Sequence, residues 1–372
     1  MSPAFIDNDG RLNWRKIGYH ARSAFAVLLA AAVLGGGGWY VYAKANEAYV
    51  EWRTEEDYIG EGKEKVEVLI PRGAGSTQVG DLLTEAGVIK STKAFRSAVE
   101  DAGAREKLQY GRFALKKELP AATALEMLLD PKNVVNEKVT FPEGTTFAEQ
   151  QAIMAEKFGV SAEELKTAAS ISYDALPAYA GGRLEGYTFP STYQVVEPVV
   201  PSSVVGTQLR QFGRIAEKLE LESKAQALGT TPHAVVTTAS IIASEVTNPD
   251  DQPMVAAVIY NRLNKGMMLQ MDSTVHYAVG KAGKVTTTAE DRKDPSPYNT
   301  YMHKGLPPGP ISNPGETALS AALNPAATDA LFFVTVNLDT GETRFAATAE
   351  EHEANVKLFQ QWCSANKDRG LC

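Results

Sequence analysis

The sequence predicts an α+β protein with an N-terminal transmembrane helix, a small α+β module and a larger α+β domain. Three observations predict this organisation. An uncharged apolar run lies near the N-terminus, alternating apolar residues with helical segments follow it, and the long remainder shows helical patterns separated by Pro/Gly-rich connections. The chain has 372 residues, 44% hydrophobic and 22% charged, which leaves room for two or three domains of about 100–200 residues each.

The apolar run at residues 23–43 is the predicted transmembrane helix. It is uncharged and close to the roughly 20 residues that a helix needs to cross a membrane. Basic residues precede it and acidic residues follow it, so the positive-inside rule places the tail, residues 1–22, in the cytoplasm and the rest of the chain outside. The alternative is a cleaved signal peptide ending at Ala43-Lys44-Ala45, but the run exceeds the apolar core of about 7–15 residues typical of such peptides.

Residues 44–64 are polar and acidic and are predicted to form a stalk, and residues 65–134 are predicted to form the small module. Its expected elements, in order, are a strand at 66–70, a helix capped by Ser76 and ended by Gly87, a helix at 94–102, a strand at 110–115 and a helix at 122–129. The segments VEVLIPRGAGSTQVGDLL and YGRFALKKELPAATALEMLL resemble the LysM-like module found before certain cell-wall enzymes. That resemblance implies glycan binding, although a short βααβ unit also has unrelated hosts.

The larger domain, residues 135–372, opens with a second strand, turn and helix over residues 138–158. Its most informative helix begins at Thr231 and Pro232, a pair that fits an N-cap and a first helical position. Glu245 lies at the end of this helix, beside an expected apolar stripe of Val235, Ala239, Ile242 and Val246. A carboxyl group packed against aliphatic side chains has a raised pKa, which suits a general acid. The alternative is an exposed glutamate that merely ends a helix.

Three segments around this helix are rich in Tyr, Asn, Asp, Thr and Gln, side chains that suit sugars through ring faces and short polar groups. They are RLEGYTFPSTY, MMLQMDSTVHYAVG and PSPYNTYMHKGLPPGPISNPG. A purely structural role in shaping surface loops is the alternative. We expect a cleft at the boundary of the two soluble parts, because ligand sites favour domain interfaces.

Composition excludes several other functions. The net charge of −8 argues against a nucleic-acid partner, because neutralising phosphates requires clustered basic residues. The sequence contains no phosphate loop, no GxSxG motif and no histidine cluster, so we expect neither a cofactor nor a metal. The two cysteines, Cys363 and Cys372, either pair in an oxidising compartment or remain thiols.

Five motifs resemble, in their order along the chain, the YceG-like (MltG) family of endolytic murein transglycosylases: LEGYTFPSTY, ASIIASEVT, VIYNRLNKGMMLQMDSTVHYAVG, YNTYMHKGLPPGPISNPG and TRFAATAEEHEANV. The resemblance implies that residues 135–372 are the catalytic domain and that Glu245 is the catalytic acid/base. Many members carry a second glutamate two residues earlier, where this chain has Ala243, and Ser273 replaces a common proline. The substrate-binding residues implied by the motifs are Glu185, Tyr187, Gln270, Asp272, Tyr298, Asn299 and Thr300. The terminal motif, Glu351-His352 with Asn355, fits either fold closure or substrate contact.

The reaction implied by this resemblance needs one carboxyl group. Glu245 would protonate the oxygen between MurNAc and GlcNAc and then accept the proton of the C6 hydroxyl, so that a 1,6-anhydro ring closes and strand elongation ends. One alternative is an inverting hydrolase with Asp272 as the base, and another is a non-enzymatic glycan-binding scaffold. The expected partners are peptidoglycan glycan strands, the cytoplasmic membrane and, because the stalk is short, membrane-bound glycan polymerases.

Overall fold

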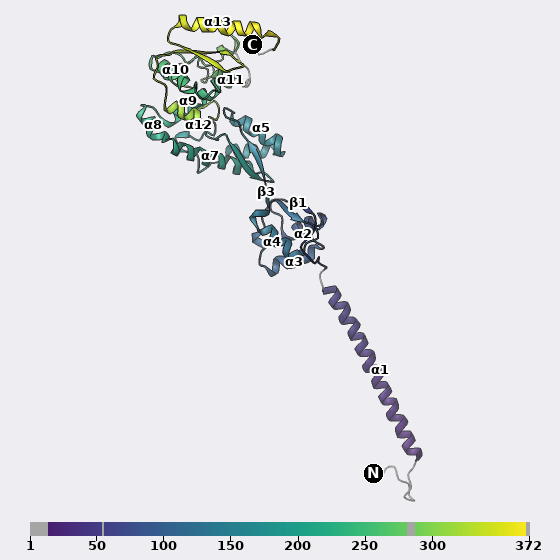
Figure 1. Cartoon of the computed structure of the whole chain (residues 1–372). Helices are drawn as coiled ribbons and strands as arrows, with labels where there is room; N and C mark the ends of the chain where they lie inside the picture. Colours follow the sequence, from purple (N-terminus) through teal and green to yellow (C-terminus); the bar gives the residue numbers. More distant parts are fainter. Residues whose placement is uncertain (1–13, 54–55, 281–286, 370–372) are drawn as a thin grey trace. The chain divides into compact units, whose positions relative to one another are not determined.

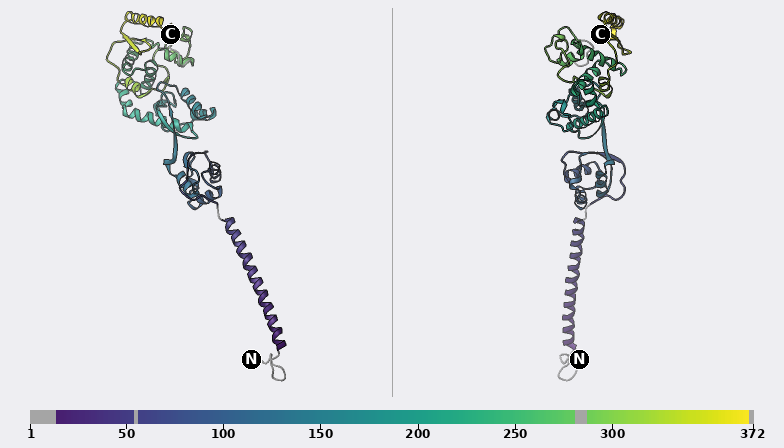
Figure 2. Two further views of the ribbon diagram at one scale, coloured as in Figure 1. Left: turned by 45° about the vertical axis from the view of Figure 1, so that its right-hand side comes forward. Right: turned by 90° about the vertical axis from the view of Figure 1, so that its left-hand side faces the viewer.

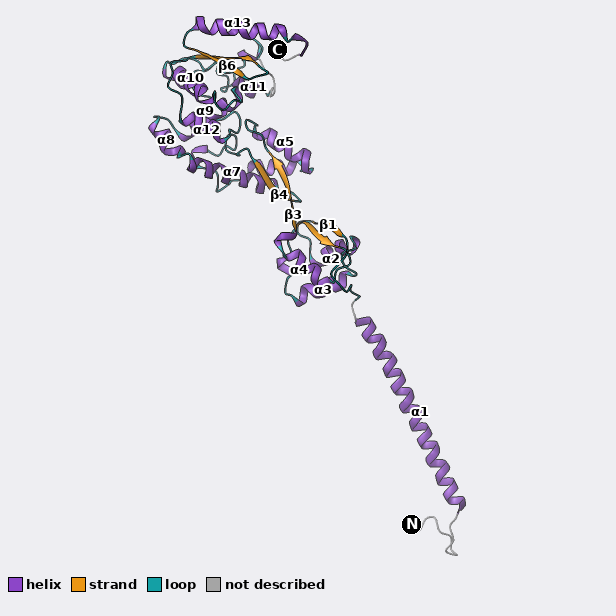
Figure 3. Cartoon of the chain, viewed as in Figure 1, coloured by secondary structure: helices purple, strands orange, loops and turns teal. Residues whose placement is uncertain are grey.

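The computed structural model describes residues 14–53, 56–280 and 287–369 (Figure 1). The chain divides into two compact units, Met1–Val134 and Val135–Cys372. Helices dominate and short antiparallel strand pairs complete the secondary structure (Figure 3). The mixed α+β class expected from the sequence is therefore confirmed.

The first element is α1 (Trp14–Arg53), which is one unbroken helix in each view (Figure 2). Its segment Ile17–Asn46 is long and apolar enough to cross a membrane, and it includes the predicted span 23–43. Gly35–Gly38 remain helical, because a helix satisfies its backbone hydrogen bonds internally even where glycine lowers its propensity. The helix continues through residues 44–53, so the first part of the predicted stalk is helical.

The remainder of the first unit is built around one strand pair. β1 (Lys65–Ile70) pairs antiparallel with β2 (Gly111–Lys116), with Val68 opposite Phe113. The helices are α2 (Ser76–Glu85), α3 (Thr92–Asp101) and α4 (Ala121–Leu129), with short 3-10 turns at Arg105–Lys107 and Pro131–Asn133. Buried aliphatic and aromatic side chains from all of these helices and strands form one core.

The capping prediction at Ser76 was wrong. Gly75 is the N-cap residue of α2 and makes no side-chain capping bond, whereas Ser91 caps α3 by accepting a hydrogen bond from the Ala94 backbone N–H at 3.2 Å. Gly87 follows α2 with a φ of +72°, a conformation that ends helices and that glycine adopts without a steric penalty.

The second unit opens with β3 (Val134–Thr140), which pairs antiparallel with β4 (Thr192–Val196). Two helices that begin with capping boxes, α5 (Phe147–Phe158) and α6 (Ala162–Ser170), and a 3-10 turn at Ala178–Ala180 lie between the strands in the sequence. The sequence does not predict β4, because the composition of residues 183–193 is typical of a loop. Tyr193 and Val195 alternate with exposed neighbours and are buried, which is the period of a strand.

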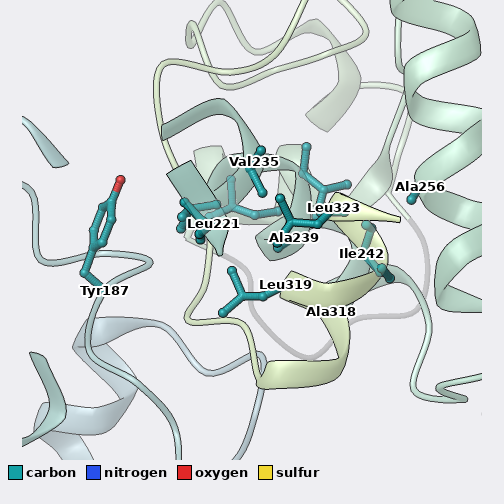
Figure 4. Close-up of a cluster of buried hydrophobic side chains, with 14 of the residues drawn as sticks. Tyr187, Leu221, Val235, Ala239, Ile242, Ala256, Ala318, Leu319 and Leu323 are labelled. Atoms are coloured by element: carbon teal, nitrogen blue, oxygen red, sulfur yellow. The ribbon is translucent and has the colours of Figure 1, made fainter. Parts of the chain in front are cut away.

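Helix α9 (Pro232–Glu245) forms the centre of the second unit. Thr231 caps it by accepting a hydrogen bond from the Ala234 backbone N–H at 3.1 Å, as its sequence predicts. Residues 235–242 are all buried, so the helix is enclosed on every face rather than along one stripe. Figure 4 shows Val235, Ala239 and Ile242 gathered with side chains of a neighbouring helix, Leu319 and Leu323.

The helices around α9 supply this core. They are α7 (Pro201–Lys218), α8 (Leu221–Ala227), α10 (Gln252–Asn264), α11 (Asp272–Val279) and α12 (Glu316–Leu323), and a 3-10 turn lies at Asp291–Lys293. Of these, α8, α10, α11 and α12 pack directly on α9. These neighbours pack on α9 from several helices, which makes α9 a rigid support for a functional side chain.

The chain ends with a hairpin and a helix. β5 (Phe332–Asn337) pairs antiparallel with β6 (Glu342–Ala346), and α13 (Ala349–Ala365) lies over the hairpin before a last turn at Lys367–Arg369 (Figure 1). This hairpin was not predicted, because most of its residues are half-buried and no clean alternation marks it. Cys372 lies outside the described residues, so its pairing with Cys363 stays open.

Candidate active site

A cleft of about 1190 Å³ lies in the second unit. Its wall is formed by the loop before α5, the end of α9, the start of α11, residues of the 292–301 segment, the β5–β6 hairpin and α13. All of its lining residues fall between Glu143 and Phe359, so this cleft belongs to the second unit alone. The expectation from the sequence, a cleft at the boundary of the two soluble parts, was wrong for this cleft. Several aromatic rings, Tyr277, Tyr301, Phe332, Phe333 and Phe359, line it beside carboxyl groups.

Glu245 is the last residue of α9 and lines this cleft. Its Oε1 accepts two hydrogen bonds from Ser273, one from the backbone N–H at 3.2 Å and one from the hydroxyl at 2.6 Å. Burial raises the pKa of Glu245 above its ordinary value, and the charge of Asp272 adds to the rise, while the two Ser273 bonds oppose it. A raised pKa in a partly buried carboxyl group is the property that a general acid needs.

Asp272, the neighbour of Ser273, has a different environment. Its Oδ1 accepts hydrogen bonds from the Tyr301 hydroxyl at 2.6 Å and the Thr287 hydroxyl at 2.8 Å, and its Oδ2 lies 3.2 Å from Arg292 Nη2. Burial alone would raise the pKa of Asp272, but the hydrogen bonds and the Arg292 charge hold it below its ordinary value. Asp272 therefore remains a carboxylate whose two oxygens are both engaged.

A further carboxyl group, Glu185, lines the cleft at the loop before α5. Its Oε1 accepts hydrogen bonds from the Phe147 backbone N–H at 3.0 Å and from Asn313 Nδ2 at 3.1 Å. Burial raises the pKa of Glu185 to about 7 despite these donors, and the nearby Glu149 charge contributes. Glu185 is thus close to half-protonated at neutral pH.

Glu185 should make stability fall as pH rises. Because its pKa rises from 4.5 to about 7 on folding, the folded state binds the proton more tightly, and the stabilisation present below pH 4.5 is lost as pH rises through 7. The loss amounts to about 3 kcal/mol. Glu185→Gln cannot titrate at this position, so most of this dependence of stability on pH should disappear. Hydrogen exchange of α9 amides at about pH 5 and about pH 8 measures the difference. The exposed Glu156→Gln is the matched control, and an unchanged slope in Glu185→Gln would contradict the assignment.

Asn313 connects the loops around Glu185. Its Oδ1 accepts three hydrogen bonds, from the Gly186 N–H at 2.9 Å, the Thr188 N–H at 3.1 Å and the Thr188 hydroxyl at 2.9 Å. Its Nδ2 donates to the Thr145 carbonyl at 3.0 Å as well as to Glu185. Asn313 lies in the ISNPG segment, but the sequence alone does not predict its role, because nothing local distinguishes an asparagine with many buried partners from one in an ordinary loop.

Gly186 explains part of this close packing. Its φ of +90° is rarely adopted by other residues, and a Cβ atom at this position would collide with the Pro310 ring. The loop bearing Glu185 therefore approaches the 308–313 loop more closely than any larger residue allows.

The remaining predicted site residues divide into two groups. Gln270 lines the cleft, together with Glu185 and Asp272. Four others do not line it: Tyr187, Tyr298, Asn299 and Thr300. Tyr298 lies one layer behind, with its ring 4.9 Å from that of Tyr277 in the cleft wall.

Tyr187, Asn299 and Thr300 are buried and bonded within the protein, so their contact with glycan stays a prediction. The Tyr187 hydroxyl lies 2.8 Å from His233 Nδ1. Asn299 Nδ2 donates to the Asp294 carbonyl at 2.7 Å, and Thr300 Oγ1 accepts from the Met271 N–H at 3.0 Å. Each of these buried polar groups thus has a hydrogen-bond partner within the fold, as buried polar groups generally require.

The terminal motif contributes to both the fold and the cleft. Glu351 completes the capping box of α13, and His352 lines the cleft with its ring stacked 5.1 Å from Phe332. Within the described ranges, His276 Nε2 and His352 Nδ1 are buried and have no hydrogen-bond partner. No group of His, Cys, Asp and Glu suited to a metal ion was found in the same ranges.

Fold and cleft define a class: an α+β protein with an apolar N-terminal helix and a cleft lined by aromatic rings and by two glutamates whose pKa values burial raises. The model of the YceG-like family matches residues 68–358. An endolytic murein transglycosylase of Bacillus subtilis is 31% identical over 349 residues, covering 90% of this chain and 92% of that protein. The chain therefore belongs to the YceG-like family.

Two further comparisons agree with this assignment. An endolytic murein transglycosylase of Streptococcus pneumoniae is 29% identical over 363 residues, covering 90% of this chain and 64% of that protein. The crystal structure of a yceG-like protein from Listeria monocytogenes aligns with a TM-score of 0.50 at 31% identity, covering 79% of this chain and 99% of that one.

Proposed function

We propose that this protein is an endolytic lytic transglycosylase of peptidoglycan. It cleaves the β-1,4 bond between MurNAc and GlcNAc in nascent glycan strands and leaves 1,6-anhydro-MurNAc ends, which terminates strand elongation. The observation that carries the proposal is the pairing in one cleft of a protonatable Glu245 with an Asp272 whose two oxygens are already engaged. The names of the Bacillus and Streptococcus relatives support the same activity.

Glu245 supplies both proton transfers in the proposed mechanism. It protonates the glycosidic oxygen as the bond to MurNAc C1 breaks, and the resulting carboxylate accepts the proton of the C6 hydroxyl while O6 bonds to C1. The aromatic rings of Tyr277, Phe332 and Phe333 offer faces on which pyranose rings can pack. Among the predicted binding residues, Glu185 and Gln270 face the glycan, and Tyr187, Tyr298, Asn299 and Thr300 hold the wall behind it.

The inverting-hydrolase alternative requires a second carboxylate to activate water opposite the acid. Asp272 is poorly suited to that task, because Tyr301, Thr287 and Arg292 already donate to it and lower its pKa. The scaffold alternative does not explain why a glutamate with a raised pKa should line the cleft.

The chain organisation is part of the proposal. Residues 1–22 form a cytoplasmic tail, 23–43 span the cytoplasmic membrane, 44–64 form the stalk, 65–134 form a LysM-like module that contacts glycan, and 135–372 form the catalytic domain. The apolar helix and the basic residues before it support this orientation. A catalytic domain tethered near the outer leaflet would meet nascent strands and the membrane-bound polymerases that make them.

Mass spectrometry of released muropeptides tests this function directly. The full-length protein in detergent, incubated with uncrosslinked glycan strands, should yield fragments ending in 1,6-anhydro-MurNAc. Reducing MurNAc ends would indicate the hydrolase instead. No cleavage by folded protein would support the scaffold.

A further inference from the structure

Ser273 contacts the proposed acid through two hydrogen-bond donors. Both of its donors, the backbone N–H and the hydroxyl, point at the same atom, Glu245 Oε1, at 3.2 and 2.6 Å. Across the described part of the chain, the hydrogen bonds to the Glu245 carboxyl group all reach this oxygen. The other oxygen, Oε2, is left for a ligand in the cleft.

The position of Ser273 explains why both donors are available. It is the second residue of α11 (Asp272–Val279), where a backbone N–H has no partner within the helix. Its hydroxyl is therefore placed beside an N–H that already needs an acceptor. The start of α11 and the end of α9, which pack together, thus meet at one carboxyl oxygen.

We propose that Ser273 is a positioning residue for Glu245: it holds Oε1 through two hydrogen bonds, so that Oε2 is the oxygen that gives and takes the proton. This inference rests on the proposed function. In the neutral acid, Oε1 is the carbonyl oxygen and accepts both bonds, while the proton is on Oε2. When the proton moves to the glycosidic oxygen, the charge that develops on the carboxylate meets donors that are already aligned.

The proton balance is complete without help from Ser273. The proton leaves Oε2 as the bond between C1 and the glycosidic oxygen breaks, and a proton from the C6 hydroxyl returns to Oε2 as the bond between C1 and O6 forms. Ser273 keeps its own proton throughout and only stabilises the ionised state of Glu245.

Other ionisable groups line the same cleft as Glu245 and Ser273. Asp272 and its partner Arg292 form an ion pair at 3.2 Å, and Tyr301 donates to Asp272. The remaining ionisable groups of the cleft wall are Glu143, Glu149, Glu185, Arg262, His276, Tyr277 and His352. A change from Ser to Ala alters none of these charges, so its effect on Glu245 reports the lost hydroxyl bond.

Three substitutions separate the two donors. Ser273→Ala removes the hydroxyl, Ser273→Thr keeps it, and Ser273→Pro removes both donors at a position in the first helical turn that proline tolerates. Each full-length variant is assayed for kcat and KM of anhydro-muropeptide release across pH, with the exposed Ser223→Ala as the matched control.

Ser273→Ala should lower kcat roughly tenfold with little change in KM, because a hydrogen bond to a developing charge is lost. The loss also raises the pKa of Glu245, so the alkaline limb of the kcat profile, where the acid loses its proton, should move to higher pH. Ser273→Thr keeps the hydroxyl and should therefore keep the wild-type kcat and alkaline limb. Ser273→Pro should lower kcat and shift the alkaline limb more than Ser273→Ala does.

An unchanged kcat and pH profile in Ser273→Ala would overturn the inference, as would a lower kcat with an unmoved alkaline limb. A carbon-13 NMR titration of Glu245, assigned with Glu245→Gln, applies the same test without turnover: the pKa must rise in Ser273→Ala. The proposed function fails separately, when wild-type protein releases no anhydro ends.

Discussion

Glu245→Gln will reduce the rate of anhydro-muropeptide release by about 10²–10⁴-fold, the usual contribution of a positioned general acid. The amide cannot give a proton to the glycosidic oxygen or accept one from the C6 hydroxyl. Its carbonyl oxygen can still accept the two bonds that Ser273 donates to Oε1, so the end of α9 should keep its geometry. The measurement is the release rate at saturating glycan, with products identified by mass spectrometry.

A matched control separates this loss from a general effect of removing a negative charge. Glu217→Gln changes an exposed glutamate on α7, distant in sequence from the cleft-lining residues, and should leave the rate unchanged. Glu245→Gln should also be at least as stable as the wild type at neutral pH, because burial already favours the neutral form of this side chain. Substantial release by the folded variant would contradict the acid/base assignment.

Asn313→Ala will destabilise the second unit by about 3–5 kcal/mol. The substitution leaves the Gly186 N–H, the Thr188 N–H and the Thr188 hydroxyl without their acceptor in the interior. It also removes the donor to Glu185 and to the Thr145 carbonyl. Buried groups without partners cost more than the net value of the bonds they lose, which is why the effect should exceed that of a simple truncation.

Hydrogen exchange of α9 amides in the full chain measures this loss, because α9 is the centre of the second unit's core. Asn324→Ala is the matched control, since Asn324 is exposed and its side chain bonds only one turn back, to the Ser320 carbonyl at 2.8 Å. Asn313→Asp adds a second test: it keeps the acceptor but turns the donor toward Glu185 into a like charge. Equal stability of the Asn313 and Asn324 alanine variants would show that the network contributes little.

The sequence by itself determined the features that depend on neighbouring residues. The apolar run predicted the N-terminal helix, and Thr231 with Pro232 predicted the start of α9. Gly87 marked a helix end, where its φ of +72° suits glycine. The order of motifs indicated the YceG-like family and singled out Glu245 before any contact was known. The signals for the helices lie within a few residues of the features they mark, and the motifs lie in a fixed order along the chain, so a linear pattern records both.

Only the tertiary structure decided which groups meet in the cleft. Ser273 reaches Glu245 across 28 positions of sequence, and Asn313 reaches Thr188 across 125. The tertiary structure also places Gln270 in the cleft wall and buries Tyr187, Asn299 and Thr300. A motif records which residues are present but not whether a polar side chain faces a ligand or a partner in the core. That depends on the packing of α9 against the helices and loops around it, which brings distant segments to one carboxyl group.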